Sequence, residues 1–191
     1  STLTRARPRH QVPAGAGCLS KQLFCGQLGL TWLAMMCYGY PCGEPLAINL
    51  GWNATTRAGR TYMDYLFQCE DPYCVVISGP CGPWGEWSQC NIKKGGAARD
   101  TVMQARELGR PVLKSICRAV LHRLARCRHV FLEAPLGSIA ILQPEMQPIK
   151  ALIDAGKLHF VRADGCALGY ADAVSGLPHY KPMGFITSMA V

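Results

Sequence analysis

Short apolar runs alternate along the chain with longer segments in which apolar residues recur every three or four positions. The runs at 21–25, 73–78, 129–135 and 158–163 have the length and the β-branched or aromatic content of strands, and a shorter run near 42–46 is a fifth candidate. The run "YCVVIS" at 73–78 is continuous rather than alternating. That pattern is typical of a strand buried on both faces of a parallel sheet.

Helical segments are expected between these runs, at 28–38, 56–70, 97–128 and 144–156. In the segment 56–70, four residues recur at helical spacing: Tyr62, Tyr65, Leu66 and Cys69. Thr55 or Thr56 can cap its N-terminus. "GRP" at 109–111 predicts a kink or a break in the third. The segment from Gly79 to about Gly96 is rich in Gly and Trp and is expected to be a loop.

Strands that alternate with helices predict an α/β fold, here a Rossmann-like three-layer sandwich with a mostly parallel sheet and helices on both faces. "VSGLP" at 174–178 predicts the turn of a C-terminal hairpin. In such sheets ligands bind in the loops at the carboxyl ends of the strands. The candidate functional residues should therefore follow the strands directly.

The chain has 191 residues, which suits one domain, and we expect that domain to span 21–191. Residues 1–20 carry several basic residues among Pro, Gly and Ala without an apolar period, so a flexible basic arm is expected there. No apolar run is long enough for a membrane span, and no signal-peptide pattern opens the sequence. We expect an intracellular protein, nuclear or cytoplasmic, that is not secreted and has no membrane partner.

Charge and cysteine content narrow the chemistry. The net charge of +8 favours polyanionic partners. The 11 cysteines are odd in number and form no C-x-x-C pair, so no disulfide framework is expected and most should be small buried side chains. The 5 histidines show no metal-ligand spacing, and no metal site is expected.

"LFCGQLGL" joins the first strand to the first helix. Phe24 ends the strand, Gly26 and Gly29 allow a tight turn beside a ligand, and the helix N-terminus then faces that ligand. Glu44 follows at the end of the second strand candidate, where an acid can accept hydrogen bonds from ribose hydroxyls. The layout is typical of nucleoside-cofactor binding, although a glycine turn in any α/β domain would look similar.

"SGPCGPW" follows the buried strand at 73–78. Gly79 and Pro80 form a stiff turn that would project Cys81 into a cleft, where a thiolate can act as a nucleophile. The alternative interpretation is that Cys81 is one more buried cysteine.

"FLEAP" places Glu133 at the end of another buried strand. A carboxylate there is costly to ionise and can share a proton with a heterocycle. Equally, Glu133 could bond a neighbouring loop or cap the next helix.

A row of basic residues at four-residue spacing runs along the long helix: Arg106, Arg110, Lys114, Arg118, His122 and Arg126. Because four residues advance about 400° on an α-helix, the row spirals across the surface. A solvated face explains it, and contact with nucleic-acid phosphates is the sharper alternative.

In this order the motifs resemble those of the cytosine-5 DNA methyltransferases. "LFCGQLGL" is similar to their cofactor loop, "GEP" to their ribose-binding acid, "SGPCGPW" to their nucleophile loop and "FLEAP" to their E-N-V strand. Segments such as "GPCGPWGEWSQCN" and "SGLPHYKP" resemble more closely the shortened methyltransferase-like segment of retroelement polyproteins. The similarity spans roughly 21–188.

The resemblance implies a division of roles. Cys81 would attack carbon 6 of cytosine in DNA and Glu133 would hold the N3 of the ring. S-adenosylmethionine would be the cofactor, held by Phe24, Gly26, Gly29, Glu44, Gly79 and Pro80. Independently of the resemblance, the basic row of the long helix supplies the candidate phosphate contacts: Arg106, Arg110, Lys114, Arg118 and Arg126. Ala134 stands where the family has Asn, so a catalytically degenerate nucleic-acid-binding or structural module of a polyprotein remains the alternative.

Overall fold

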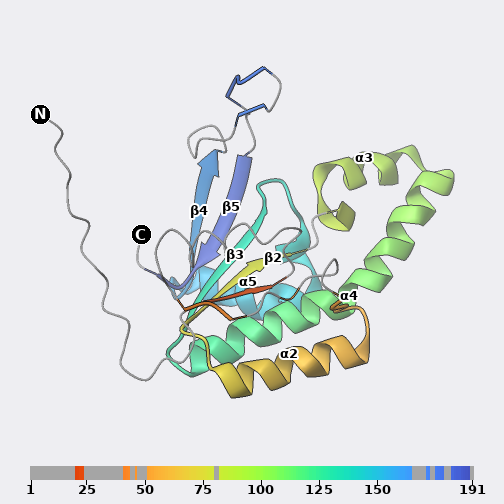
Figure 1. The fold of residues 1–191 in the computed structure, drawn as a ribbon. Coiled ribbons are helices and arrows are strands. Elements are labelled where there is room, and N and C mark those ends of the chain that lie inside the picture. The colour runs from red at the N-terminus through yellow and green to blue at the C-terminus, as the bar shows by residue number, and fades with distance from the viewer. Residues whose placement is uncertain are drawn as a thin grey trace, which may run out of the picture.

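The computed structural model describes residues 20–23, 41–43, 46, 51–79, 82–164, 171–172, 175–178 and 182–189. In these residues the chain forms one mixed β-sheet with helices packed against it (Figure 1). The expected α/β class is confirmed. None of the helices described is both long and apolar enough to cross a membrane.

The sheet has five strands in the order β1-β2-β3-β5-β4. β1, β2 and β3 pair in parallel, whereas β5 pairs antiparallel with β3 on one side and with β4 on the other. Four strands therefore run in one direction and β5 runs against them. The bounds are β1 (Ser20–Leu23), β2 (Cys74–Ser78), β3 (His129–Pro135), β4 (His159–Asp164) and β5 (Pro182–Thr187).

The register aligns the ends of the three parallel strands. Leu23, the last residue of β1, pairs with Ile77, and Ser78, the last residue of β2, pairs with Glu133. The loops that leave β1, β2 and β3 thus start from one edge of the sheet, which we call the carboxyl edge.

Helix α2 (Arg57–Glu70) precedes β2 in the chain and begins as its sequence predicts. Thr56 is the N-cap, and its hydroxyl accepts a hydrogen bond of 3.1 Å from the backbone N–H of Gly59. The helix buries Met63, Leu66 and Phe67, whereas Tyr62 and Tyr65 are exposed.

Helix α4 (Gly96–Ala125) is continuous although it contains Pro111. Of the two expected alternatives, a kink or a break, the break is therefore wrong. A proline inside a helix removes one backbone hydrogen bond and crowds the preceding turn, at about 3 kcal/mol. Residues on both sides of Pro111 are buried, among them Val102, Leu113 and Ile116. Because burying each such side chain contributes about 1.5–3 kcal/mol, packing outweighs the cost of the proline.

The segment expected to be a loop after β2 contains a short 3₁₀ turn, η2 (Gly82–Trp84), and helix α3 (Glu86–Lys94). In α3 only Ser88 is buried, so the helix has no apolar stripe that sequence periodicity can detect. Glycines flank α3 on both sides, so the sequence around it is typical of a loop.

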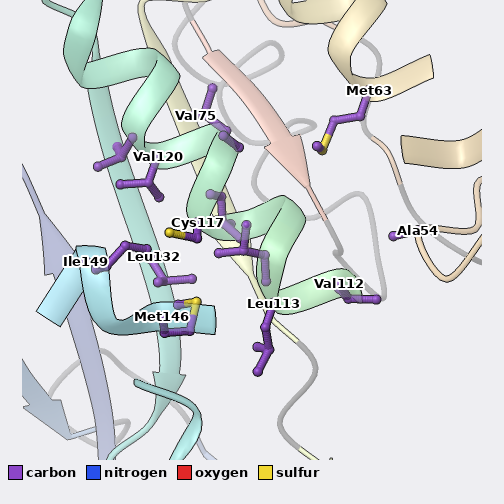
Figure 2. Packing of buried hydrophobic residues seen from close by; sticks show 14 of the residues in the cluster. Ala54, Met63, Val75, Val112, Leu113, Cys117, Val120, Leu132, Met146 and Ile149 are labelled. Atoms are coloured by element: carbon purple, nitrogen blue, oxygen red, sulfur yellow. The ribbon is translucent and has the colours of Figure 1, made fainter. Parts of the chain in front are cut away.

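The main core lies between α4 and the sheet and is closed by helix α5 (Gln147–Asp154). Figure 2 shows Cys117 of α4, Leu132 of β3 and Ile149 of α5 gathered in one cluster with Met146. Met146 ends η4 (Pro144–Met146), which follows η3 (Ala140–Leu142). This core fixes α4 and the η3–η4 segment beside the carboxyl edge.

Six cysteines fall within the described part of the chain, and no disulfide joins any two of them. Only Cys74 and Cys117 are buried, while Cys69, Cys90 and Cys127 are exposed. The expectation that most cysteines are buried is therefore wrong for this part of the chain. The three exposed cysteines lie in helices α2 and α3 and just after α4. Because the cysteine side chain is small, leaving it in contact with water costs little free energy.

Candidate active site at the carboxyl edge

Glu133 lies near the end of β3, beside the last residue of β2. Its side chain is partly buried, and among the described residues its carboxylate makes no hydrogen bond and no ion pair. Because no described group holds this carboxylate, it is a candidate for ligand binding.

A cavity of about 190 Å³ opens at this edge, between the sheet, α4 and the η3–η4 segment. Gly79, the residue after β2, and Glu133 both line it. Most of the remaining lining is apolar, with Leu113, Ile116 and Met146 among it. Since pockets for drug-sized ligands measure about 300–1,000 Å³, this cavity accommodates a single ring more readily than a whole nucleoside cofactor.

Gly79 stands where the chain leaves β2 close to α4. A Cβ atom at this position would lie 3.4 Å from the Cδ1 atom of Ile116. The contact shows that Ile116 lies level with the carboxyl edge, so the middle of α4 borders the candidate site.

Several predicted site residues lie outside the described residues: Phe24, Gly26, Gly29, Glu44, Pro80 and Cys81. The structure does describe the strands that precede the two loops of interest. Phe24 follows the end of β1, and Cys81 comes three positions after the end of β2. Both strands end at the edge where Glu133 lies.

Trp84 and Arg106 hold the chain segment that follows Cys81. Trp84 is fully buried, and the Arg106 guanidinium lies over its ring at 5.2 Å from the centroid. Arg106 Nε also donates a 3.0 Å hydrogen bond to the carbonyl of Pro83. Burial, with the nearby charge of Arg110, lowers the pKa of Arg106. Trp84 is not among the site residues predicted from the sequence, although a large apolar side chain in a glycine-rich segment was an available signal.

The segments after β2 and β3 are also bound to each other. The backbone N–H of Ile139 donates to the carbonyl of Trp84 at 2.9 Å. A Cβ atom on Gly137 would overlap the carboxylate of Glu86, so the first residue of α3 packs directly on this glycine. Within η2 and α3, the Ser88 hydroxyl donates to the carbonyl of Gly82. The chain that leaves Cys81 is therefore anchored beside the chain that leaves Glu133.

The other cations of the α4 row differ in their partners. Arg110 pairs with Glu107 at 3.0 Å and with Glu145 at 3.1 Å. Burial opposes ionisation of Glu145, but its own backbone N–H, Arg110 and the charge of Lys114 together lower its pKa. Arg118 pairs with Asp64 of α2 at 2.7 Å. Lys114 forms no hydrogen bond and no ion pair with the residues described.

Arg126 lies at the opposite end of the sheet, where three guanidinium groups share one carboxylate. Arg123, Arg126 and Arg128 contact the oxygens of Asp71 at 2.8, 3.0 and 2.7 Å. Partial burial raises the pKa of Asp71, but the hydrogen bonds from Arg128, Arg126 and Arg123 outweigh it and lower that pKa to about 2. Arg123 is completely buried and lies over the Phe67 ring, which joins α2 to α4.

The two buried cysteines are unsuited to nucleophilic chemistry, because the thiolate is the attacking species. Burial raises the pKa of the Cys74 thiol to about 12 and also raises that of Cys117. No group of three or more His, Cys, Asp and Glu side chains with the geometry of a metal site occurs in the described ranges.

No protein-family model matches the sequence, and no curated protein matches it. Among solved structures, the methyltransferase EhMeth of Entamoeba histolytica aligns over 91% of this chain and 53% of its own, with 10% identity and a TM-score of 0.47. The Dnmt2 methyltransferase of S. pombe aligns over 91% of this chain and 51% of its own, with 8% identity and a TM-score of 0.45. The chain spans about half the length of each. Likenesses at this level assign neither a fold nor an activity.

Proposed function

We propose that the chain is a Rossmann-like methyltransferase-type domain, arranged as a three-layer sandwich, that methylates cytosine in DNA at the carboxyl edge. The observation that carries the proposal is the position of Glu133. Glu133 pairs with Ser78, the last residue of β2, which is three positions before Cys81. Glu133 also lines a cavity together with Gly79. The motif with Cys81 thus follows β2, and the motif with Glu133 forms the end of the neighbouring parallel strand β3.

In the proposed reaction Cys81 is the nucleophile. Its thiolate adds to carbon 6 of the cytosine ring, and the Glu133 carboxyl gives its proton to N3, where electron density accumulates. Carbon 5 then gains the methyl group and loses its proton, the thiolate leaves as the 5,6 double bond re-forms, and N3 returns its proton to Glu133. The largely apolar cavity beside Glu133, of about 190 Å³, is of a size for one pyrimidine ring. To reach it, the target base must leave the duplex or be presented in a single strand.

S-adenosylmethionine, when bound, supplies an electrophilic methyl group. Phe24, Gly26, Gly29 and Glu44 would hold it, with Gly79 and Pro80 on the adjoining strand end. The parallel pairing of β1 with β2 supports this assignment, because the loop after Leu23 starts next to Gly79. Glycines at that position let a ligand approach the backbone closely.

We further propose that the domain, residues 21–191 with a basic arm at 1–20, works inside the cell as part of a retroelement polyprotein. Motif similarity to the embedded methyltransferase-like segments supports this context. Access to DNA requires either a nuclear location or a cytoplasmic nucleic-acid intermediate.

The second candidate is a non-catalytic nucleic-acid-binding module in the same context. Ala134 favours it, because β3 has a methyl group where the methyltransferase pattern has an amide next to the acid. The cations of the long helix also serve nucleic-acid binding without any methyl transfer.

Trapping on DNA that contains 5-fluorocytosine tests the proposed activity. The fluorine blocks the proton loss that releases the enzyme, so an active chain with S-adenosylmethionine remains covalently attached. Cys81→Ser should abolish the adduct, whereas Cys90→Ser, an exposed cysteine of α3, should leave it intact. An adduct that persists in Cys81→Ser would exclude Cys81 as the nucleophile, and no adduct with the unaltered chain would favour the binding module.

A further inference from the structure

The contacts of the α4 cations separate them into two groups. Arg106 and Arg110 are bound by Pro83 and by glutamates. Arg118 instead pairs with Asp64 of the neighbouring helix α2, and Lys114 borders one hollow together with Arg118 and with Arg60 of α2. Figure 1 shows α2 running alongside α4. We call the groove between them, formed by Arg60, Asp64, Lys114 and Arg118, the α2–α4 seam.

Two hollows lie along the seam. One, of about 330 Å³, is lined by Arg60, Lys114 and Arg118. The next, of about 250 Å³, shares Arg118 and adds Asp64 and His122. Three cations and one carboxylate give the seam a local charge of +2, counting His122 as neutral.

The protonation of His122 follows from its neighbour. Its Nδ1 atom lies 3.0 Å from Arg123 Nη2, which can only donate, so Nδ1 accepts. Burial, with the charges of Arg123 and Arg126, lowers the pKa of His122. His122 therefore adds a neutral ring to the seam at neutral pH rather than another charge.

Helix geometry places the seam on the outer side of α4. Ile116 faces the sheet, and Lys114 and Arg118 are each two positions from it, about 200° around the helix. The seam is therefore level with the carboxyl edge but separated by α4 from the cavity beside Glu133. A ligand in the seam would be bound apart from the reacting base.

Lys114 and Arg118 also have donors to spare. Lys114 makes no hydrogen bond and no ion pair among the described residues, and Arg118 uses one guanidinium nitrogen on Asp64 while its side chain remains 56% exposed. Arg60 uses Nη1 on the carbonyls of Ala54 and Thr55. The unused donors of these three residues border one hollow.

A second cluster with an excess of positive charge lies at the C-terminal end of the same helix. Arg126, 54% exposed, follows Arg118 by two turns, about 12 Å along the axis, and shares Asp71 with two other arginines. A small anion can occupy only one of the two positions. A chain of regularly spaced phosphates can contact both.

We propose that the α2–α4 seam binds the phosphate backbone of a nucleic acid and anchors the strand next to the carboxyl edge. The inference rests on the nucleic-acid partner in the proposed function and names the surface that contacts it. It does not require that the chain transfer a methyl group.

Fluorescence anisotropy of a short labelled single-stranded DNA, measured over a salt series with the full chain, tests this surface. The double variant Lys114→Gln/Arg118→Gln removes two positive charges from the seam. Its affinity should fall about tenfold at low salt, and the slope of log affinity against log salt should decrease in magnitude by about 1.4. Lys114→Gln alone breaks no ion pair described here and should give about half of that decrease.

The matched control is Lys93→Gln/Lys94→Gln, which removes the same charge from exposed positions of α3. It should change affinity and slope little. Equal weakening by the two double variants would show that net charge alone governs binding and would overturn the inference. Displacement of the DNA by polyglutamate at equal charge concentration would overturn nucleic acid as the occupant.

The outcomes also separate this inference from the proposed activity. If the unaltered chain binds no DNA, both the nucleic-acid partner and the seam assignment are wrong. If the seam variants lose binding while the 5-fluorocytosine adduct never forms with the unaltered chain, the seam stands and the methyl-transfer proposal fails.

Discussion

Ser78 and Glu133 are partners in the parallel ladder between β2 and β3, and Ser78 is the last residue of its strand. The pair brings together two motifs that lie more than fifty residues apart in the sequence. β2 ends at Ser78, and β3 continues for two residues beyond Glu133 to Pro135, so the chain that follows Ser78 starts beside Glu133. The candidate active site depends on this register.

Glu133→Gln should abolish covalent trapping on 5-fluorocytosine DNA and leave the fold intact. The amide cannot share a proton with N3 as the carboxyl does, and Glu133 has no described protein partner whose loss would destabilise the chain. Glu107→Gln, on the exposed side of α4, is the matched control and should trap normally. Normal trapping by Glu133→Gln would remove this residue from the proposed chemistry.

Asp71→Asn should lower the free energy of unfolding by about 3 kcal/mol, because it leaves the buried guanidinium of Arg123 without its counter-charge. Asp64→Asn breaks an exposed ion pair with Arg118 and should cost less than about 1 kcal/mol. Urea denaturation of both variants measures the difference. Equal effects would mean that the Asp71 cluster contributes no more than a surface ion pair.

The Asp71 cluster also predicts how stability depends on pH. The pKa of Asp71 is about 2 in the folded chain, against an unfolded value near 3.9. The ionised form is thus favoured by folding, and its contribution is complete above about pH 4 and is lost as the pH falls towards 2. The stability gap between the unaltered chain and Asp71→Asn should narrow over this range, and a constant gap would contradict the assignment.

Two helical glycines should respond oppositely to alanine. At Gly109 a Cβ atom would sit 3.6 Å from the Trp84 ring, an ordinary contact, so Gly109→Ala should raise the free energy of unfolding by about 0.5–1 kcal/mol through helix propensity. At Gly59 a Cβ atom would overlap the backbone carbonyl of Asn53, and Gly59→Ala should cost about 1–3 kcal/mol. Thermal and urea unfolding of the two variants would test both signs. A loss of stability in Gly109→Ala would mean that Trp84 packs more tightly on α4 than this distance implies.

Continuous apolar runs made the central strands predictable. "YCVVIS" and "HVFLEAP" became β2 and β3 because such runs can be buried on a sheet regardless of distant partners. Thr56 was predictable as a cap because capping is a local interaction. Which face of α2 is exposed could not be predicted, because Tyr62, Tyr65 and Cys69 share helical spacing with the residues that pack inward.

The partners of charged and polar residues could not be predicted from the sequence, because they depend on tertiary placement. Arg106 belongs to a regular basic row, yet in the fold it lies over Trp84 and bonds Pro83. The continuity of α4 through Pro111 and the helical state of 86–94 likewise follow from packing rather than from local preference. At the candidate site, Glu133 and the loop motifs could be predicted from the sequence. The pairing of Ser78 with Glu133 could not, because it depends on the register between β2 and β3.

The central claim is that the carboxyl edge forms a site for S-adenosylmethionine and a cytosine ring. Calorimetric titration of the full chain with S-adenosylmethionine tests it most directly. We expect saturable heat with a dissociation constant below millimolar, and weaker binding when Glu44→Ala removes the proposed ribose contact. No detectable heat at millimolar ligand would exclude the cofactor site and favour a nucleic-acid-binding module.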